Sequence, residues 1–249
     1  MRVTIVTIFP ELFAPLLSTS LLGRAVEKGF LEVHVVDLRQ FAEPPHHVVD
    51  DEPYGGGAGM VMQAPPWIRA VRELSGPDTW KILLSPQGQT LSEAKVRELS
   101  TRPDCLFLCA RYEGVDERVR RTVVDEEISI GDYVVAGGEV PAMVLLEAVS
   151  RQLPGVVGRS SSVENDSFRS GILDFPHYTR PRDVEGMAVP DVLLSGNHAA
   201  IEHWRQREAL RSTLRKRPDL LAQTDLTAAQ EALLREIQVE DEPHAKVKS

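Results

Sequence analysis

Short apolar runs alternate with amphipathic segments along the first 155 residues. Runs of β-branched and apolar residues predict strands over 3–8, 31–38, 80–84, 105–110 and 127–130. Apolar residues at helical spacing predict helices over 12–17, 65–74, 92–99, 116–123 and 141–153. Strands that alternate with helices are typical of a parallel sheet with helices on both faces, so the pattern predicts an α/β fold.

The pattern changes after Gly155. Residues 159–170 are polar and rich in serine, residues 176–190 show no regular spacing, and the chain from residue 196 has helical spacing with a break at Pro218. We therefore predict an α/β domain over 1–158, a mobile interdomain linker over 159–173 and a small helical domain over 174–249.

Composition is that of an ordinary globular protein: 249 residues, 42% hydrophobic and 26% charged. There is no basic-then-apolar leader and no apolar run of roughly 18 residues, so we expect a cytoplasmic protein with no membrane partner. Cys105 and Cys109 lie in one apolar run and are interpreted as buried structural thiols. They are too few for a dedicated metal site.

A basic segment stands out in a chain whose net charge is -9. Between residues 203 and 218, Glu208 is the one acid among six bases, which are Arg205, Arg207, Arg211, Arg215, Lys216 and Arg217. A basic helix in an acidic protein indicates a local contact with a polyanion such as nucleic acid. The alternative is a solvated helix face.

Three loops that follow predicted strands carry candidate chemistry: 50–60, 110–118 and 129–139. Ligands bind at the carboxyl ends of parallel strands, so these loops are expected to form a site. The first has glycine at four of five successive positions and the third contains Gly137-Gly138, which allow close backbone approach. A flexible turn or a helix cap would explain each loop alone. The chain has no GxGxxG sequence, which disfavours a dinucleotide-binding dehydrogenase.

Eleven segments occur in an order that resembles one family. They are IFPELF (8–13), GRA (23–25), VDD (49–51), PYGGG (53–57), LSPQG (84–88), RYEGVDER (111–118), SIGDY (129–133), GGE (137–139), DSF (166–168), PHYTRP (176–181) and SGNH (195–198). Together they resemble the bacterial tRNA (guanine-37-N1) methyltransferases of the SPOUT superfamily, up to about residue 221. The sequence departs from the family pattern at Pro45, Ala58 and Ala110.

The resemblance implies a fold, a cofactor and partners. The fold is a parallel sheet with a deep trefoil knot, which holds S-adenosylmethionine in a bent conformation. The enzyme is a homodimer with each active site at the subunit interface, and the C-terminal helical domain binds the anticodon arm of tRNA. A Mg²⁺ ion is a further expectation, with Glu113 nearby but no dedicated ligand cage.

The resemblance also implies roles for individual residues. Asp166 and Arg151 are the expected catalytic residues, and Asp50 and Tyr54 are expected near the target base. Arg205, Arg207, Arg211 and Arg215 are expected to contact tRNA. The expected cofactor-binding residues are Leu84, Ser85, Tyr112, Glu113, Gly114, Ile130, Gly131, Tyr133, Val135, Gly137, Gly138 and Pro141.

The expected chemistry is removal of the N1 proton of guanine by Asp166, while Arg151 stabilises the negative charge that develops on O6. Two further alternatives stay open. One is a different SPOUT enzyme, such as a ribose 2′-O-methyltransferase. The other is a non-catalytic RNA-binding protein that keeps the knot for dimerisation.

Overall fold

The computed structural model describes residues 1–158 and 166–245. The chain divides into two compact units, over residues 1–158 and 159–249. None of the described helices is long and apolar enough to span a membrane.

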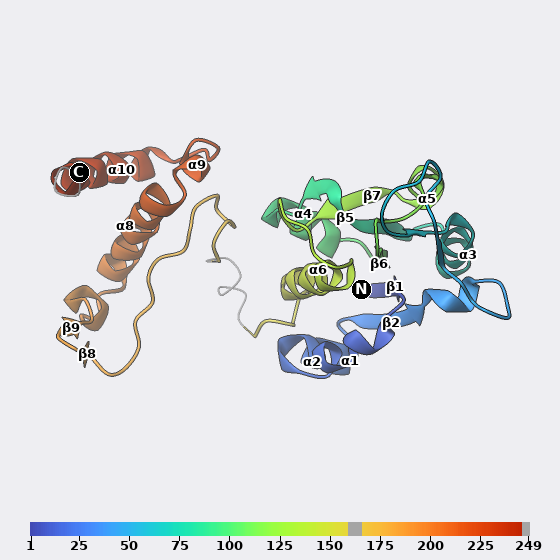
Figure 1. Cartoon of the computed structure of the whole chain (residues 1–249). Helices are drawn as coiled ribbons and strands as arrows, with labels where there is room; N and C mark the ends of the chain where they lie inside the picture. The colour runs from blue at the N-terminus through green and yellow to red at the C-terminus, as the bar shows by residue number, and fades with distance from the viewer. Residues whose placement is uncertain (159–165, 246–249) are drawn as a thin grey trace. The chain divides into compact units, whose positions relative to one another are not determined.

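The first unit is built on a five-stranded sheet in the order β2-β1-β6-β5-β7, with every pair parallel (Figure 1). The α/β fold with a parallel sheet is therefore confirmed. The strands are β1 (Arg2–Thr7), β2 (Glu32–Asp37), β5 (Trp80–Thr90), β6 (Asp104–Cys109) and β7 (Glu126–Ser129).

Helices cover both faces of this sheet because its strands are apolar on both sides. In β6, Phe107 belongs to one core cluster, whereas Leu106 and Leu108 belong to the other. The first cluster includes residues of α2 (Ser20–Glu27), α4 (Glu93–Ser100) and α6 (Glu139–Gln152). The second includes residues of α3 (Ala64–Leu74), α5 (Glu117–Val123) and the 3₁₀ helix η2 (Leu38–Phe41).

Two predicted elements near the N-terminus differ from the structure. The predicted helix 12–17 is split into the 3₁₀ helix η1 (Pro10–Leu12) and a single turn, α1 (Ala14–Leu17), on either side of the fully buried Phe13. Helix α2 was not predicted, and its central Gly23 weakens the helical signal. A Cβ at Gly23 would lie 2.7 Å from the carbonyl carbon of Ser18, so tight packing requires this glycine.

Strand β5 extends six residues beyond the predicted end at Leu84. Ser-Pro-Gln-Gly is typical of a turn, but here it forms an irregularity, after which Gln89 pairs with Ile128 of β7. A Cβ at Gly88 would overlap the backbone of Glu127 and Ile128. Residues 85–88 are thereby held against β7.

A short antiparallel pair lies beside the sheet, formed by β3 (Asp50–Asp51) and β4 (Val61–Met62). It closes the glycine-rich segment 53–60 into a loop. Gly114 and Glu113 connect that loop to the segment after β6: the Met62 amide donates to the Gly114 carbonyl at 2.9 Å, and the Glu113 amide to the Met60 carbonyl at 3.0 Å.

The second unit is mainly helical, with α8 (His198–Lys216), α9 (Pro218–Leu221), α10 (Ala228–Ala245) and the 3₁₀ helix η3 (Asp191–Leu194). Its core comprises Ile172, Ala209, Leu210, Leu233 and Ile237. The stretch 176–190, predicted to be irregular, contains a small hairpin of β8 (Asp183–Val184) and β9 (Met187–Ala188).

Part of the predicted linker packs on this unit. The Leu173 amide donates to Thr213 Oγ1 on α8 at 2.9 Å, and Thr224 Oγ1 donates to the Gly171 carbonyl at the same distance. Residues 159–165 of the predicted linker lie outside the described residues.

Candidate active site

A pocket of about 270 Å³ lies at the irregular part of β5 and at the carboxyl ends of β6 and β7. Three segments line it: 84–87 from β5, 110–114 after β6, and 128–138 at the end of β7 and beyond it, with Arg120 and Pro141 from the following helices. The lining includes eleven of the twelve residues predicted to bind the cofactor. Gly131 is the exception. Gly131 has a φ of +150° and lies against the ring of Tyr133. A Cβ at Gly131 would lie 2.5 Å from Tyr133 Cε1.

The glycine pair after β7 joins two walls of the pocket. The Gly138 amide donates to the Ala110 carbonyl at 2.8 Å, and Gly137 forms an antiparallel bridge with Arg111. A Cβ at Gly138 would lie 2.6 Å from the Cα of Cys109. The close approach that Gly138 permits is therefore to the protein's own backbone, and it fixes the distance between the loops after β6 and β7.

A buried ion pair lies behind this junction. Glu139 is 1% exposed, and its Oε1 accepts a hydrogen bond of 2.7 Å from Thr7 Oγ1. Its Oε2 lies 2.8 Å from Arg111 Nε, without the alignment of a hydrogen bond. The Arg111 guanidinium also lies over the Phe9 ring, 4.5 Å from its centroid. Removing Arg111 would leave the Glu139 charge buried without its partner, so loss of Arg111 should destabilise the junction between the loops after β6 and β7.

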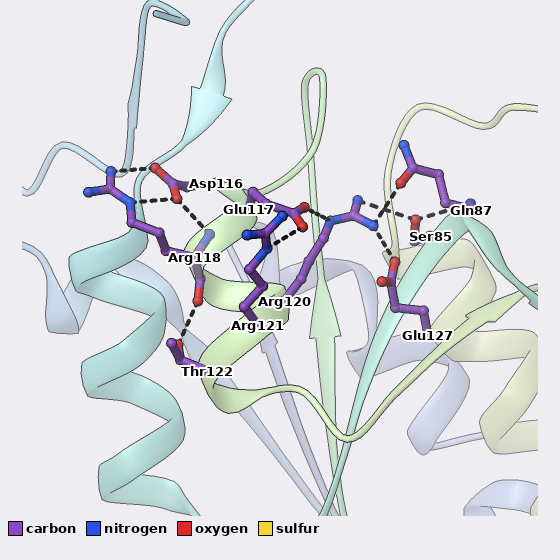
Figure 2. Close-up of polar contacts among 9 residues, drawn as sticks. All are labelled: Ser85, Gln87, Asp116, Glu117, Arg118, Arg120, Arg121, Thr122 and Glu127. Atoms are coloured by element: carbon purple, nitrogen blue, oxygen red, sulfur yellow. Dashed lines mark hydrogen bonds and ion pairs between the residues drawn. The ribbon is translucent and has the colours of Figure 1, made fainter.

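Arg120 is a charged residue of the lining that the sequence analysis missed. It lies on α5, and its Nη1 donates to Gln87 Oε1 at 2.9 Å and to Glu127. Its Nη2 is 3.5 Å from Ser85 Oγ (Figure 2). Helical spacing showed only that Arg120 lies one position after the apolar Val119; the partners come from β5 and β7, which no local pattern connects to it.

Tyr112 and Glu113, in the turn after β6, add polar groups to the lining. Tyr112, with a φ of +60°, is 52% exposed, and among the described residues Glu113 is the one carboxylate on the lining. The Glu113 side chain contacts the glycine-rich loop: a Cβ at Gly59 would lie 2.7 Å from its Cγ. Among the described residues, no three His, Cys, Asp or Glu side chains converge on a position that could hold a metal ion.

The other predicted site residues lie outside the pocket lining of the described chain. Asp50 is half-buried in β3, and Tyr54 is fully exposed on the glycine-rich loop. Arg151 is half-buried in the last turn of α6 in the first unit, and Asp166 is half-buried in the second unit.

The arginines of α8 have acidic partners from a later helix. Glu240 of α10 forms ion pairs with Arg207 and with Arg211, the latter at 2.7 Å. Asp241 pairs with Arg215 at 2.7 Å and raises the pKa of that guanidinium. Arg205 lies 3.6 Å from Glu202 and over the Phe175 ring. The charge of this helix is thus largely balanced within the unit, which a charge count over residues 203–218 could not show.

Comparison with known proteins identifies the family. The model of the family described as tRNA (Guanine-1)-methyltransferase TrmD matches residues 1–223. A tRNA (guanine-N(1)-)-methyltransferase of Dictyoglomus turgidum is 52% identical, over 96% of this chain and 98% of its own length. Proteins of the same name from Carboxydothermus hydrogenoformans and Geobacillus kaustophilus are each 48% identical, covering 94% and 97% of this chain and 92% and 100% of their own lengths. The chain therefore belongs to the tRNA (guanine-1)-methyltransferase TrmD family and is an enzyme of the methyltransferase class.

Proposed function

We propose that this protein transfers a methyl group from S-adenosylmethionine to N1 of guanine 37 of tRNA, next to the anticodon. The observation that carries the proposal is the pocket at the irregular part of β5 and the ends of β6 and β7, which gathers eleven of the twelve expected cofactor-binding residues. The curated relatives are named for methylation of guanine N1 in tRNA, which agrees with this reaction.

The pocket suits the methyl donor in chemistry. Its volume of about 270 Å³ lies just below the ordinary range of about 300–1,000 Å³ for small-molecule sites. Leu84, Ile130, Val135 and Pro141 supply apolar surface for an adenine ring, and the turns at 112–114 and 136–138 supply backbone groups for polar recognition. When bound, S-adenosylmethionine supplies an electrophilic methyl group on a sulfonium.

Asp166 and Arg151 perform the chemistry on guanine in this proposal. The Asp166 carboxylate accepts the proton from N1, whose lone pair then attacks the methyl carbon as the carbon–sulfur bond breaks and the neutral thioether leaves. The Arg151 guanidinium is a cation, and it stabilises the negative charge that develops on O6 as the proton leaves. Asp50 and Tyr54 lie near the target base.

Homodimerisation is part of the proposal, with each active site formed between subunits. Exposed apolar side chains support it: Val140 and Val144, one turn apart on α6, are 54% and 43% exposed, and Val134 on the pocket loop is 83% exposed. A second copy of the chain would bury this surface. The dimer predicts a solution mass of twice that of one chain, measured by light scattering, and a monomer mass would contradict it.

We further propose the family's trefoil knot and the division of labour between the parts of the chain. The Gly138–Ala110 hydrogen bond and the Arg111–Gly137 bridge support the knot because they hold the segment after β7 against the segment after β6. Residues 1–158 are the catalytic and cofactor-binding domain, 159–173 the linker that carries Asp166, and 174–249 the domain that binds the anticodon arm through α8. Any Mg²⁺ acts near Glu113, and chelation with EDTA tests the need for it.

The direct test is nucleoside analysis of tRNA transcripts after incubation with the protein, S-adenosylmethionine and Mg²⁺. We expect N1-methylguanosine with guanine at positions 36 and 37, and none when adenine replaces guanine 37. A ribose-methylated product would instead identify a 2′-O-methyltransferase. No methylation of any kind would overturn the proposal.

The role of Asp166 is tested separately with Asp166→Asn. Loss of the base should lower the single-turnover rate by about 10²–10⁴-fold while tRNA binding and cofactor binding remain. Asp183→Asn is the matched control, because Asp183 is exposed in β8 and its contact with the Gly186 amide needs only an acceptor oxygen. Equal rates for the two variants would exclude Asp166 as the base.

A further inference from the structure

Arg120 is a largely buried cation on the pocket wall that the proposed methyl transfer does not use. Its side chain is 14% exposed, whereas that of its neighbour Arg121 is 76% exposed. The buried Val119 and the Asp116 cap fix α5, where the Asp116 carboxylate accepts from the Arg118 amide at 2.8 Å. Helix α5 therefore directs Arg120 toward Gln87 and Glu127, whereas the exposed Arg121 pairs with Glu117 of the same helix (Figure 2).

The Arg120 guanidinium connects separate segments of the wall. Nη1 donates to Gln87 from the irregular part of β5 and to Glu127 from β7. Nη2 lies 3.5 Å from Ser85 Oγ. A Cβ at Gly114 would lie 3.8 Å from Arg120 Nη2. The guanidinium thus lies beside the turn after β6 while it holds the residues of β5. Ser85, Gln87 and Gly114 all line the pocket, so Arg120 lies between two of its walls and is bonded to one of them.

The charge of Arg120 is balanced from two elements. Glu127 contacts Nη1, and the Glu117 carboxylate lies 3.8 Å from Nε. This balance matters for the proposed ligand because a sulfonium is itself a cation. An uncompensated guanidinium on the wall would repel the methyl donor but not its neutral thioether product.

We propose that Arg120 is a positioning residue for the methyl donor, and that Glu127 neutralises it so that the pocket accepts a cationic ligand. The proposal rests on the assignment of this pocket to S-adenosylmethionine. It differs from a general stabilising role because it predicts effects on cofactor affinity, and on the preference between donor and product, that stability alone would not produce.

The test compares Arg120→Met with Arg121→Met, and uses calorimetry to measure binding of S-adenosylmethionine and S-adenosylhomocysteine. Loss of hydrogen bonds from a charged group predicts that Arg120→Met weakens both ligands by about tenfold or more, and that Arg120→Lys recovers part of this loss. Arg121→Met should match the wild type. In steady-state assays the KM for S-adenosylmethionine should rise while the KM for tRNA stays unchanged.

Glu127→Gln tests the charge balance and covers the case in which Arg120→Met fails to fold. It keeps the shape and an acceptor oxygen, but removes the closer of the two carboxylates that balance the Arg120 charge and leaves only Glu117, 3.8 Å from Nε. Loss of this negative charge from the pocket wall should weaken the cationic donor about threefold or more relative to the thioether.

Each outcome has a distinct meaning. Wild-type affinity in Arg120→Met would refute the positioning role and leave the proposed function intact. Equal losses of donor and product affinity in Glu127→Gln would refute the neutralising role. No binding of either ligand by the wild-type protein would refute the cofactor assignment and, with it, this inference.

Discussion

Substitution of Gly138 by alanine tests how tightly the pocket loops are packed. Gly138 has a φ of −75° and a ψ of −8°, which alanine adopts without strain, so any effect comes from the added methyl group. That methyl would lie 2.6 Å from the Cα of Cys109 and 3.0 Å from the amide nitrogen of Ala110. Both are backbone atoms of or next to the central strand β6, and they cannot rotate away as a side chain could.

The size of the effect follows from these distances. The optimal van der Waals separation of two carbon atoms is about 3.5–4.0 Å, so the loop must move by about 1 Å. Overpacking of this kind destabilises by about 1–3 kcal/mol, and loss of the 2.8 Å hydrogen bond to Ala110 adds about 1 kcal/mol. The sum corresponds to a fall in melting temperature of roughly 4–16 °C. A displacement of about 1 Å at the pocket wall also lowers turnover by about 10²-fold.

Thermal unfolding, cofactor binding and single-turnover methylation measure these effects. Gly76→Ala is the matched control, because the nearest atom to its added methyl, Thr79 Oγ1, would be at an ordinary contact distance of 3.8 Å. We expect the control to behave as the wild type in all three assays. If Gly138→Ala did so too, the loops after β6 and β7 would not be in the close contact that the structure shows.

Three further predictions follow from charges and thiols elsewhere in the protein. Hydrogen bonds from Arg2 lower the pKa of Asp104, so its stabilising contribution is present above the ordinary Asp pKa of about 3.9 and is lost as the pH falls through the lowered value. Asp104→Asn should therefore lower the free energy of unfolding by about 1–3 kcal/mol at pH 7, as measured by urea unfolding. The difference between wild type and variant should become smaller near pH 3. A difference that stayed the same there would show that the Asp104 charge is not its cause. Burial raises the pKa of Cys105 to about 12 and that of Cys109 well above its ordinary value. Both thiols should resist iodoacetamide at pH 8 until the protein is unfolded, and alkylation of the native protein, seen by mass spectrometry, would show that they are accessible. Glu240→Gln removes the partner shared by Arg207 and Arg211, so tRNA binding should become tighter and more dependent on salt if α8 contacts the phosphates. Unchanged binding and salt dependence would place these two arginines outside the tRNA contact.

Local sequence patterns correctly predicted those elements whose burial and capping depend on residues within the element or next to it. The run 105–110 is apolar at every position because β6 is buried on both faces, and Ser92 and Asp116 cap the helices that follow them. The end of β5 could not be predicted in this way. Ser-Pro-Gln-Gly is a turn sequence, and it is held in the sheet by backbone contact with β7, which lies about 40 residues later in the chain.

The candidate site shows the same division between local and long-range information. The motifs marked the three segments that line the pocket, because glycines and turn residues are visible in the sequence itself. Local patterns could not predict the partners of Arg120, because these come from two strands. They also could not predict the acids that balance the charge of α8, because these lie on a helix about 30 residues later. Ion pairs between distant segments depend on the fold, so only the structure could reveal them.

The order of the strands has a consequence for how the protein is made. Strand β1 is synthesised before the other strands, but its partner β6 lies about 100 residues later in the chain. The side-chain hydrogen bond between Arg2 and Asp104 joins the two strands. A ribosome that adds about 5–20 residues per second takes roughly 5–20 s to reach that partner. During this interval Val3, Ile5 and Val6, which the finished sheet buries completely, have only β2 beside them. The nascent chain therefore exposes an apolar strand edge for seconds, long enough for chaperones on the ribosome to bind it.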